Sequence, residues 1–369
     1  MCMGASCHFP SWSAFEMDIT GRLQEQVQDA YAAQRPLRIR AGTTKSFYGR
    51  PVDADAELDL REHSGIVDYQ PAELYVTVRA GTRLRELQET LAGQGQTLAF
   101  EPPCHGEDST IGGVVACGFS GPARPYAGSA RDHLLGVRIL DGRGQDLRFG
   151  GHVMKNVAGY DLSRLMVGAQ GSLGVLLELS LKVLPLPARH MTFVQERQMA
   201  AAIKEMQRWE AQPIPLSASA WMDGQLYLRF SGAESALAGL RACVGGDLLL
   251  PAEATQFWAQ LRDQQLPFFA PGSALWRLAL PTGTPPVLME LPQLLEWGGS
   301  IRWLRGDASA EEIRAQTASR NGYAIQYRGA PNPHPLPPLS EPLRILHGRV
   351  KDAMDPRHIL NPGRLYADL

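Results

Sequence analysis

The sequence predicts an α+β protein of two domains, a larger glycine-rich first domain and a smaller antiparallel α+β second domain. The chain of 369 residues has room for two domains of ordinary size and a large core. Hydrophobic residues make up 44% and charged residues 20% of the chain, which is typical of a folded globular protein. Short apolar runs separated by glycine extend to residue 187, and alternating strand and helix patterns follow over residues 188–328.

The first domain is expected to span residues 17–187. Apolar residues recur at helical spacing over residues 19–34, where Pro36 then stops the helix. Asp141 and Gly142 stand between two apolar runs and predict a β-hairpin. The other elements expected in this domain are strands over 37–42, 57–61 and 74–81, a helix over 83–95, and a pair of strands over 174–187.

The second domain is expected to span residues 188–328 as an antiparallel sheet with helices on one face. Asp223 and Gly224 predict a hairpin turn, and Ser309 with acidic residues behind it predicts the start of a helix. The expected strands are 193–196, 217–221, 225–230, 274–281, 300–306 and 323–329, and the expected helices are 200–210, 234–244, 252–263 and 309–320.

Two segments complete the predicted organisation. Residues 329–342 contain six prolines and predict an extended, semi-rigid crossing, with a proline-motif ligand for a partner as the alternative. Residues 343–369 are expected to form a final helix and a tail that return to the first domain. Residues 1–16 lack the basic start and long apolar stretch of a signal peptide, and we interpret them as a tail or as an upstream-start artefact.

Composition excludes several classes of function. The formal net charge of −2 gives no electrostatic footprint for nucleic acid or an anionic membrane surface. No pair of the five cysteines has the spacing of a zinc or iron–sulfur clip, so no metal site is expected in this chain. These cysteines fit a reduced, cytoplasmic compartment. No run of about 18 apolar residues exists, so no transmembrane segment is expected.

Three glycine-rich segments carry the functional signal. The first, RIRAGTTKSFYG at residues 38–49, runs from the predicted strand into a turn from Arg40 to Gly49 that can point backbone N–H groups at an anion, with Lys45 adding charge. The second, STIGGVVACGFSG at 109–121, holds four glycines, whose conformational cost a simple core strand would not accept. The third, KNVAGYDLSRLMVGAQGSLG, continues into an apolar strand, and a plain tight turn remains its structural alternative.

The glycine spacing excludes two common nucleotide-binding motifs. No G-K-[ST] follows the second segment, so it is not a Walker loop. The segment is also not a G-x-G-x-x-G turn between strand and helix. Sites for ATP and for nicotinamide dinucleotides are therefore not expected.

Together the three segments resemble the FAD-binding domain of the vanillyl-alcohol oxidase and p-cresol methylhydroxylase flavoproteins, the PCMH-type family. The resemblance covers residues 17–187, and the NPG sequence at 361–363 is similar to relatives that oxidise 2-hydroxy acids. KNVAGYDLSRL followed by GSLG most closely resembles the FAD-binding subunits of bacterial glycolate oxidases, or glycolate dehydrogenases. The resemblance implies two α+β subdomains with FAD between them.

The resemblance also implies which residues hold FAD. The first loop and the second segment would meet the pyrophosphate and the flavin, and the third segment would line the adenosine and flavin side through its backbone. The residues carried over are Arg40, Ala41, Gly42, Thr43, Thr44, Lys45, Ser46, Thr110, Ile111, Gly112, Gly113, Gly118, Gly159, Tyr160, Asp161, Gly171, Leu173, Gly174 and Val175.

Relatives that hold flavin covalently do so through a histidine or a cysteine. Thr43, Thr44 and Lys45 stand where that histidine would fall, so non-covalent FAD is expected. Cys104 and Cys117 lie near the second segment, and a thiol link to flavin through one of them is the alternative to their being small buried residues.

The catalytic residues are less well defined. Oxidation of a 2-hydroxy acid needs a base for the hydroxyl proton and a cation for the carboxylate. The catalytic flavoprotein subunit that resembles this family carries an H-x-G-D-G-N-x-H segment, which this chain lacks. His105 is a weak candidate for the base, and Arg124 and Arg131 are weak candidates for carboxylate contacts. Surface or structural roles are the alternative for all three.

The resemblance therefore implies a subunit that is not active alone. A partner flavoprotein would oxidise glycolate to glyoxylate, and an iron–sulfur subunit would pass electrons to quinone, with attachment to the inner membrane only through partners. Two alternatives remain open from the sequence. One is a self-sufficient FAD-linked oxidoreductase for another alcohol or 2-hydroxy acid, and the other is an assembly scaffold without flavin.

Overall fold

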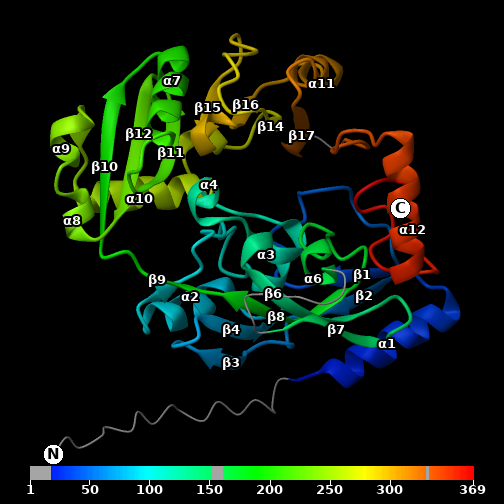
Figure 1. Ribbon diagram of the computed structural model, residues 1–369. Coiled ribbons are helices and arrows are strands. Elements are labelled where there is room, and N and C mark those ends of the chain that lie inside the picture. Colours follow the sequence, from blue (N-terminus) through cyan, green and yellow to red (C-terminus); the bar gives the residue numbers. More distant parts are fainter. Residues whose placement is uncertain (1–17, 152–160, 330–331) are drawn as a thin grey trace, which may run out of the picture.

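The computed structural model describes residues 18–151, 161–329 and 332–369, and it places two sheets one above the other (Figure 1). The lower sheet has five strands in the order β3-β4-β8-β6-β7, and every neighbouring pair is antiparallel. Its strands are β3 (Ile66–Gln70), β4 (Tyr75–Arg79), β6 (Leu134–Leu140), β7 (Asp146–Gly150) and β8 (Val175–Lys182).

Strand β8 forms the centre of the lower sheet and is buried on both faces, with Val175, Leu177, Leu179 and Leu181 on one face and the paired polar residues Glu178 and Ser180 on the other. Seven of its eight residues, Val175–Leu181, are buried. The sequence predicted a strand pair over 174–187, and the structure instead has one long strand followed by a two-residue strand in another sheet. That short strand, β9 (Leu184–Pro185), pairs with β5 (Gln96–Thr97).

The hairpin predicted at Asp141 and Gly142 is confirmed, but its turn is longer than a two-residue loop. Strands β6 and β7 pair from Gly136–Gly150 to Leu140–Asp146. The Asp141 carboxylate accepts hydrogen bonds from the backbone N–H groups of Arg143 and Gln145, and Gly144 carries the positive φ of 76°. The aspartate therefore closes the turn by an Asx-type contact.

Helices and a parallel strand pair cover the lower sheet and form the rest of its domain. The predicted helices over 19–34 and 83–95 are confirmed, and β3 is a strand that sequence reasoning missed. The elements are α1 (Thr20–Ala33), the parallel pair β1 (Leu37–Arg40) and β2 (Ala56–Asp59), α2 (Leu84–Ala92), α3 (Ile111–Cys117), α4 (Arg124–Ala127), α5 (Ala130–His133) and α6 (Leu162–Leu165).

The upper sheet has eight strands in the order β13-β10-β12-β11-β15-β16-β14-β17, and all its pairs are antiparallel. The predicted hairpin turn is confirmed, since Asp223 and Gly224 both have positive φ, 50° and 79°. The strands are β10 (Arg189–Glu196), β11 (Leu216–Met222), β12 (Gln225–Gly232), β13 (Asp247–Leu248), β14 (Leu275–Ala279), β15 (Gln293–Glu296), β16 (Ile301–Arg305) and β17 (Tyr323–Arg328).

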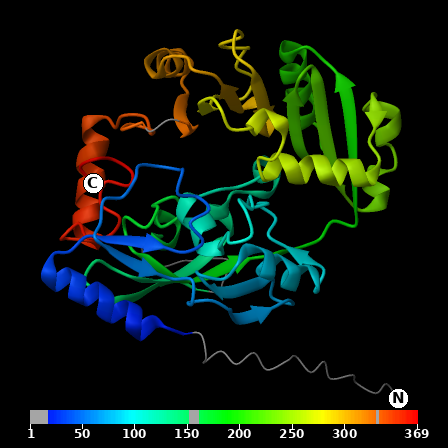
Figure 2. The same ribbon diagram turned by 180° about the vertical axis from the view of Figure 1, so that it is seen from behind.

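The expectation that all helices of the second domain cover one face of its sheet is wrong. One face packs against α7 (Met199–Glu210) and against α8 (Glu234–Leu237) and α9 (Leu240–Cys243). The opposite face, with Ala218 and Ala220, packs against Trp258 and Leu261 of α10 (Pro251–Arg262) and against Phe119 of the first domain. Figure 2 shows α10 lying below the upper sheet, toward the lower domain.

Three further details of the second domain differ from or refine the prediction. The helix expected over 234–244 is two short helices, α8 and α9, which Ala238 and Gly239 separate. Strand β15 and the 3-10 helices η1 (Pro267–Phe269) and η2 (Trp297–Gly299) were not predicted. Helix α11 (Ala310–Ala318) begins as predicted, because the Ser309 side chain accepts a hydrogen bond from the Glu312 N–H.

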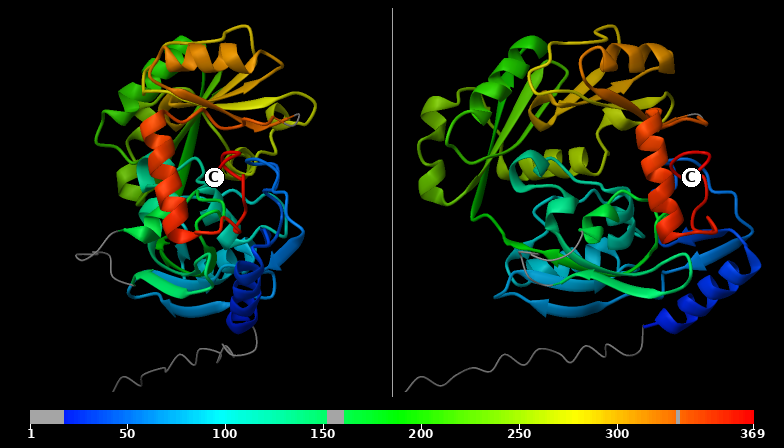
Figure 3. Two further views of the ribbon diagram at one scale, coloured as in Figure 1. Left: turned by 90° about the vertical axis from the view of Figure 1, so that its right-hand side faces the viewer. Right: turned by 45° about the vertical axis from the view of Figure 1, so that its right-hand side comes forward.

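The C-terminal segment crosses back to the lower domain, as expected. Helix α12 (Glu341–Met354) stands at the edge of the molecule and runs down to the β1 side (Figure 3). Its buried Lys351 donates to the carbonyls of Ser172 and Leu360 and pairs with Asp355 at 2.7 Å. Leu360 then bridges Leu37 in parallel, so the tail lies beside the first loop.

Two features are absent from the described residues. None of the helices there is long and apolar enough to span a membrane. In the same parts of the chain, no group of three or more histidine, cysteine or acidic side chains is arranged to hold a metal ion.

Candidate cofactor site

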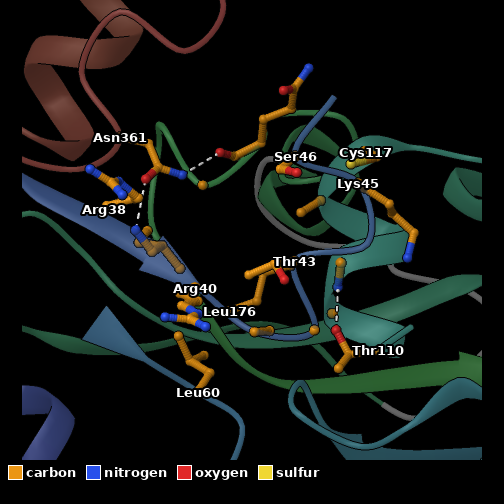
Figure 4. Close-up of a pocket in the computed structure, with 18 of the residues that line it drawn as sticks. Arg38, Arg40, Thr43, Lys45, Ser46, Leu60, Thr110, Cys117, Leu176 and Asn361 are labelled. Atoms are coloured by element: carbon orange, nitrogen blue, oxygen red, sulfur yellow. Dashed lines mark hydrogen bonds between the residues drawn. The ribbon is translucent and has the colours of Figure 1, made fainter. Parts of the chain in front are cut away.

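A cavity of about 560 Å³ lies where the first loop, the start of α3, the 170–174 turn and the C-terminal tail meet (Figure 4). Cavities of this size are typical of sites for cofactors and other small molecules. Its lining comes from segments more than 300 residues apart in the chain, from Arg38 to Arg364. The fold, rather than any one motif, therefore builds the site.

The first loop follows strand β1 and passes unusually close to the segment that precedes α3. A Cβ atom on Gly42 would lie 1.5 Å from the Asp108 carbonyl oxygen, so only glycine fits there. Thr43 has a positive φ of 52°, and the two residues together turn the loop toward the cavity. The loop from Ala41 to Ser46 lines the cavity throughout.

Lys45 is the main positive charge of this loop, and it is buried with only 7% of its surface exposed. Its Nζ donates hydrogen bonds to Ser109 Oγ at 2.6 Å and Thr44 Oγ1 at 3.2 Å. Within the described part of the chain it forms no ion pair with a carboxylate. Burial lowers the pKa of Lys45 because it removes water from the ammonium group. A buried cation held by hydroxyls alone favours an anion beside it.

Helix α3 presents its first turn to the cavity. The Thr110 side chain accepts a hydrogen bond from Gly113 N–H at 3.2 Å and so fixes the start of the helix. A Cβ atom on Gly112 would lie 2.6 Å from the Ala80 carbonyl oxygen, so glycine lets the helix approach strand β4 closely. At Gly113 the same atom would lie 3.2 Å from Thr110 Oγ1 and 3.7 Å from Lys45 Nζ, so a side chain there would crowd the two polar groups that line the cavity.

The turn before β8 is held by the C-terminal tail, which sequence reasoning did not place in the site. Asn361 accepts a hydrogen bond from Ile39 N–H and donates one to the Gln170 carbonyl, both at 2.8 Å. Arg364 donates to Gln170 Oε1 at 3.0 Å and to the Tyr48 carbonyl. The NPG sequence at 361–363 was the available signal, but nothing in it indicated contact with the first loop.

The structure brings most of the predicted cofactor residues to this cavity and places others elsewhere. Arg40, Ala41, Gly42, Thr43, Thr44, Lys45, Ser46, Thr110, Gly112, Gly113, Gly171 and Gly174 line it. Ile111 and Val175 are fully buried in the first core, and Leu173 packs against that core. Asp161 is exposed and caps α6, and Gly118 lines a second cavity. Gly159 and Tyr160 lie outside the described residues.

The base candidate His105 has no contact with the two arginine candidates among the described residues, whereas Arg131 lies close enough to Arg124 to act on it electrostatically. His105 packs against Phe47 and Phe119, and burial lowers its pKa to about 4, so its ring is neutral at neutral pH. Arg124 is exposed and lies over the Trp297 ring at 4.5 Å. Arg131 is exposed on α5.

A second, smaller cavity of about 80 Å³ lies between the two domains. Cys117 lines both cavities, so the two spaces lie on either side of this residue. Burial raises the pKa of the Cys117 thiol to about 11, which keeps it protonated at neutral pH. The second cavity is walled by Tyr48 and Phe119 from the first domain and by Trp303 and Tyr327 from the second.

The larger cavity fits the chemistry of FAD. The diphosphate carries about two negative charges, which oriented backbone N–H groups and a buried ammonium group can offset. Lys45 supplies that ammonium group, and the glycine backbones of Gly112 and Gly113 line the cavity beside it. Arg40 Nε is buried without a hydrogen-bond partner, so a donor remains for a bound group.

Comparisons with known proteins agree with this reading. Residues 17–150 match the FAD binding domain family. The chain is 45% identical over 356 residues to glycolate oxidase subunit GlcE of Escherichia coli K12, covering 96% of this chain and 99% of that protein. It is 30% identical over 145 residues to glycolate oxidase subunit GlcD of Bacillus subtilis 168, covering 39% of this chain and 30% of that protein.

Two further matches are a partial one in sequence and one in fold. A D-lactate dehydrogenase of Anaerostipes hadrus is 32% identical over 131 residues, covering 35% of this chain and 27% of that protein. A solved structure of alkyldihydroxyacetonephosphate synthase superposes with a TM-score of 0.65 at 15% identity, covering 93% of this chain and 74% of that one. At that identity the likeness concerns the fold alone.

Proposed function

The chain belongs to the family of glycolate oxidase subunit GlcE, and from this premise we propose that it is the FAD-binding subunit of a glycolate oxidase complex. In that complex it contributes to the oxidation of glycolate to glyoxylate. The observation that carries the proposal is the glycine-lined cavity with Lys45, a buried cation that has only hydroxyl partners. When bound there, FAD supplies a two-electron acceptor.

Residues of the chain would bind and orient the cofactor without a covalent bond. Lys45 and the backbone of Gly112 and Gly113 would hold the diphosphate, and Asn361 would fix the turn that carries Gly171. Two observations support a non-covalent cofactor. No histidine is among the described residues that line the cavity, and the Cys117 thiol has a raised pKa, which makes it a poor nucleophile.

We further propose that the chain does not turn over glycolate alone. Two observations support this view. The chain lacks the H-x-G-D-G-N-x-H segment, and the candidate base His105 makes no contact with the candidate carboxylate-binding residues Arg124 and Arg131 among the described residues. A GlcD-type flavoprotein would oxidise the substrate, and an iron–sulfur subunit would carry electrons onward to quinone.

The test begins with the purified chain and its partner subunits. We expect the chain to carry non-covalent FAD, visible as flavin absorbance that acid precipitation releases into the supernatant. Glycolate and an artificial electron acceptor should give turnover only when the partner flavoprotein is added. A colourless chain that does not take up FAD would contradict the cofactor assignment. Full turnover by the isolated chain would instead favour a self-sufficient oxidoreductase.

A further inference from the structure

The second cavity, between the two domains, contains a charged group that the cofactor site does not use. Arg277 of strand β14 faces the first domain, and its guanidinium lies over the rings of Trp297 at 5.0 Å and Trp303 at 5.9 Å. The described residues offer it no hydrogen bond and no ion pair. Its planar set of N–H donors is therefore positioned by stacking and left available for a ligand.

A second arginine of the same cavity, Arg262, is paired with a carboxylate. Arg262 forms a two-pronged ion pair with Asp263, with N–O distances of 2.7 and 2.8 Å. Its charge is thus balanced within the chain. Arg277 has no such hydrogen-bonded partner among the described residues. The Glu296 carboxyl is near enough to interact with it electrostatically but forms no ion pair with it, so the donors of Arg277 remain open to a ligand.

Glu296 lies on the same cavity wall and is buried, with 6% of its surface exposed. Its Oε1 accepts a hydrogen bond from Trp303 Nε1 at 2.5 Å, and its Oε2 makes no hydrogen bond within the described residues. Burial raises the pKa of Glu296 to about 7, against the opposing effect of that hydrogen bond and of Arg277. Near neutral pH the group can therefore both donate and accept a proton.

The size of the cavity limits what could bind. Its volume of about 80 Å³, at roughly 10–15 Å³ for each water-sized atom, holds about five to eight non-hydrogen atoms. Tyr48, Phe119 and Tyr327 close the space with aromatic surface. A small carboxylic acid fits this volume, whereas a nucleotide or a peptide does not.

We propose that this cavity is a binding site for a small 2-hydroxy or 2-oxo carboxylate, in which Arg277 holds the carboxylate and Glu296 hydrogen-bonds the 2-oxygen. The arrangement follows from one unpaired fork of donors and one free carboxyl oxygen on the wall of the same small space. The shared residue Cys117 brings a bound acid next to the cofactor cavity. The inference rests on the proposed function but adds a site that belongs to this subunit itself.

The test is calorimetric titration of the full-length, FAD-loaded chain with glycolate, and with acetate, which lacks the hydroxyl group. Replacing Arg277 with methionine should weaken the binding of both acids at least about tenfold, because a charge-assisted hydrogen-bond pair is lost. Replacing Glu296 with glutamine should reduce the advantage of glycolate over acetate. Arg208→Met is the matched control, because Arg208 lies over Trp209 at the same 5.0 Å but on exposed α7.

The outcomes separate the two proposals. A chain that holds FAD but binds no glycolate at millimolar concentration overturns this inference and leaves the cofactor assignment intact. A chain that holds no FAD overturns the proposed function first. Equal weakening in Arg277→Met and Arg208→Met also overturns the site. Thermal unfolding of each variant checks its fold, and Arg277→Lys, which keeps the charge but not the planar fork, should bind with intermediate affinity if Arg277→Met does not fold.

Discussion

Lys45 is the residue from which the cofactor assignment can be tested most directly. Its ammonium group is buried and contacts only the hydroxyls of Ser109 and Thr44. Replacing it with methionine should weaken FAD binding about 10- to 100-fold, because a hydrogen bond to a charged group contributes about 1.5–3 kcal/mol. Equilibrium dialysis of the apo chain against FAD measures the change.

A matched lysine provides the control for this prediction. Lys204 is exposed on α7, in the second domain, and its replacement by methionine should leave FAD affinity unchanged. The unfolding free energy of apo Lys45→Met should not fall, because the desolvation that lowers the pKa of Lys45 is then relieved. Unchanged FAD affinity in Lys45→Met would separate this residue from the cofactor.

Glu296 gives a pH dependence of stability with a defined sign. Burial raises the pKa of Glu296 from 4.5 to about 7 in the folded state. The folded chain therefore retains a proton that the unfolded chain releases, and this stability is complete below pH 4.5 and lost as the pH rises to about 7. Glu296→Gln cannot ionise and should not show this loss.

The measurement is the difference in unfolding free energy between wild type and Glu296→Gln across that pH range. As the pH rises, the unfolding free energy of wild type should fall relative to that of Glu296→Gln. A pKa shift of this size limits that relative fall to about 3 kcal/mol. Other titrating groups cancel between the two proteins. A pH-independent difference would mean that the Glu296 carboxyl titrates normally in the folded chain.

At the scale of secondary-structure elements, the position of α3 depends on one glycine. A Cβ atom on Gly112 would lie 2.6 Å from the Ala80 carbonyl oxygen and 2.7 Å from the Ala80 Cβ. Gly112→Ala should therefore push the start of α3 away from β4, lowering the unfolding free energy by about 1–3 kcal/mol and weakening FAD binding. Urea unfolding and FAD titration measure the two effects.

A glycine-to-alanine substitution at an uncrowded helix position is the control for Gly112→Ala. Gly21 in α1 is exposed and has no atom within 4 Å of the added Cβ. Gly21→Ala should stabilise the chain by about 0.4–1 kcal/mol, because it reduces the entropy of the unfolded state. If both variants behaved alike, close packing of α3 on β4 would not explain Gly112.

Local signals in the sequence predicted most elements but not how they meet. The spacing of apolar residues predicted helices α1, α2, α7 and α10, and the residue types Asp223 and Gly224 predicted a hairpin turn. Each of these signals depends only on residues that are close in the chain. Helix α3 was not predicted as a helix because three of its seven residues, Gly112, Gly113 and Cys117, and two valines are poor helix formers. Packing against β4 and β8 holds it instead.

The candidate sites show the same division. The first loop and the glycines of the cofactor cavity were predicted, because close backbone approach leaves a mark in the sequence. Asn361 and Arg364 reach that cavity only because the tail bridges Leu37. Arg277 and Glu296 lie on strands that pair through β16, and their meeting depends on sheet register, which no local pattern encodes.

At the scale of the whole molecule, the second domain is placed over the cofactor domain by a small number of polar contacts. Trp297 Nε1 donates to the Gly121 carbonyl at 3.0 Å, and the Cys104 N–H donates to Asp263 at 2.8 Å. Phe119 adds an apolar contact beneath the upper sheet. The small cavity with Arg277 is lined by residues of both domains, so its shape depends on how the two domains are placed.

The ion pair between Arg229 and Glu101 is a partly buried charged contact between the domains. Its N–O distance is 2.7 Å, and the two side chains are 9% and 25% exposed. Arg229→Met should lower the unfolding free energy by about 1–3 kcal/mol and separate the unfolding of the two domains, since the partner carboxylate is left half-buried. Arg189→Met, which removes an exposed ion pair to Glu234, should cost at most about 1 kcal/mol. Urea unfolding followed by tryptophan fluorescence and by flavin absorbance measures both. Coincident transitions in Arg229→Met would mean that the remaining contacts between the domains are enough to keep their unfolding coupled.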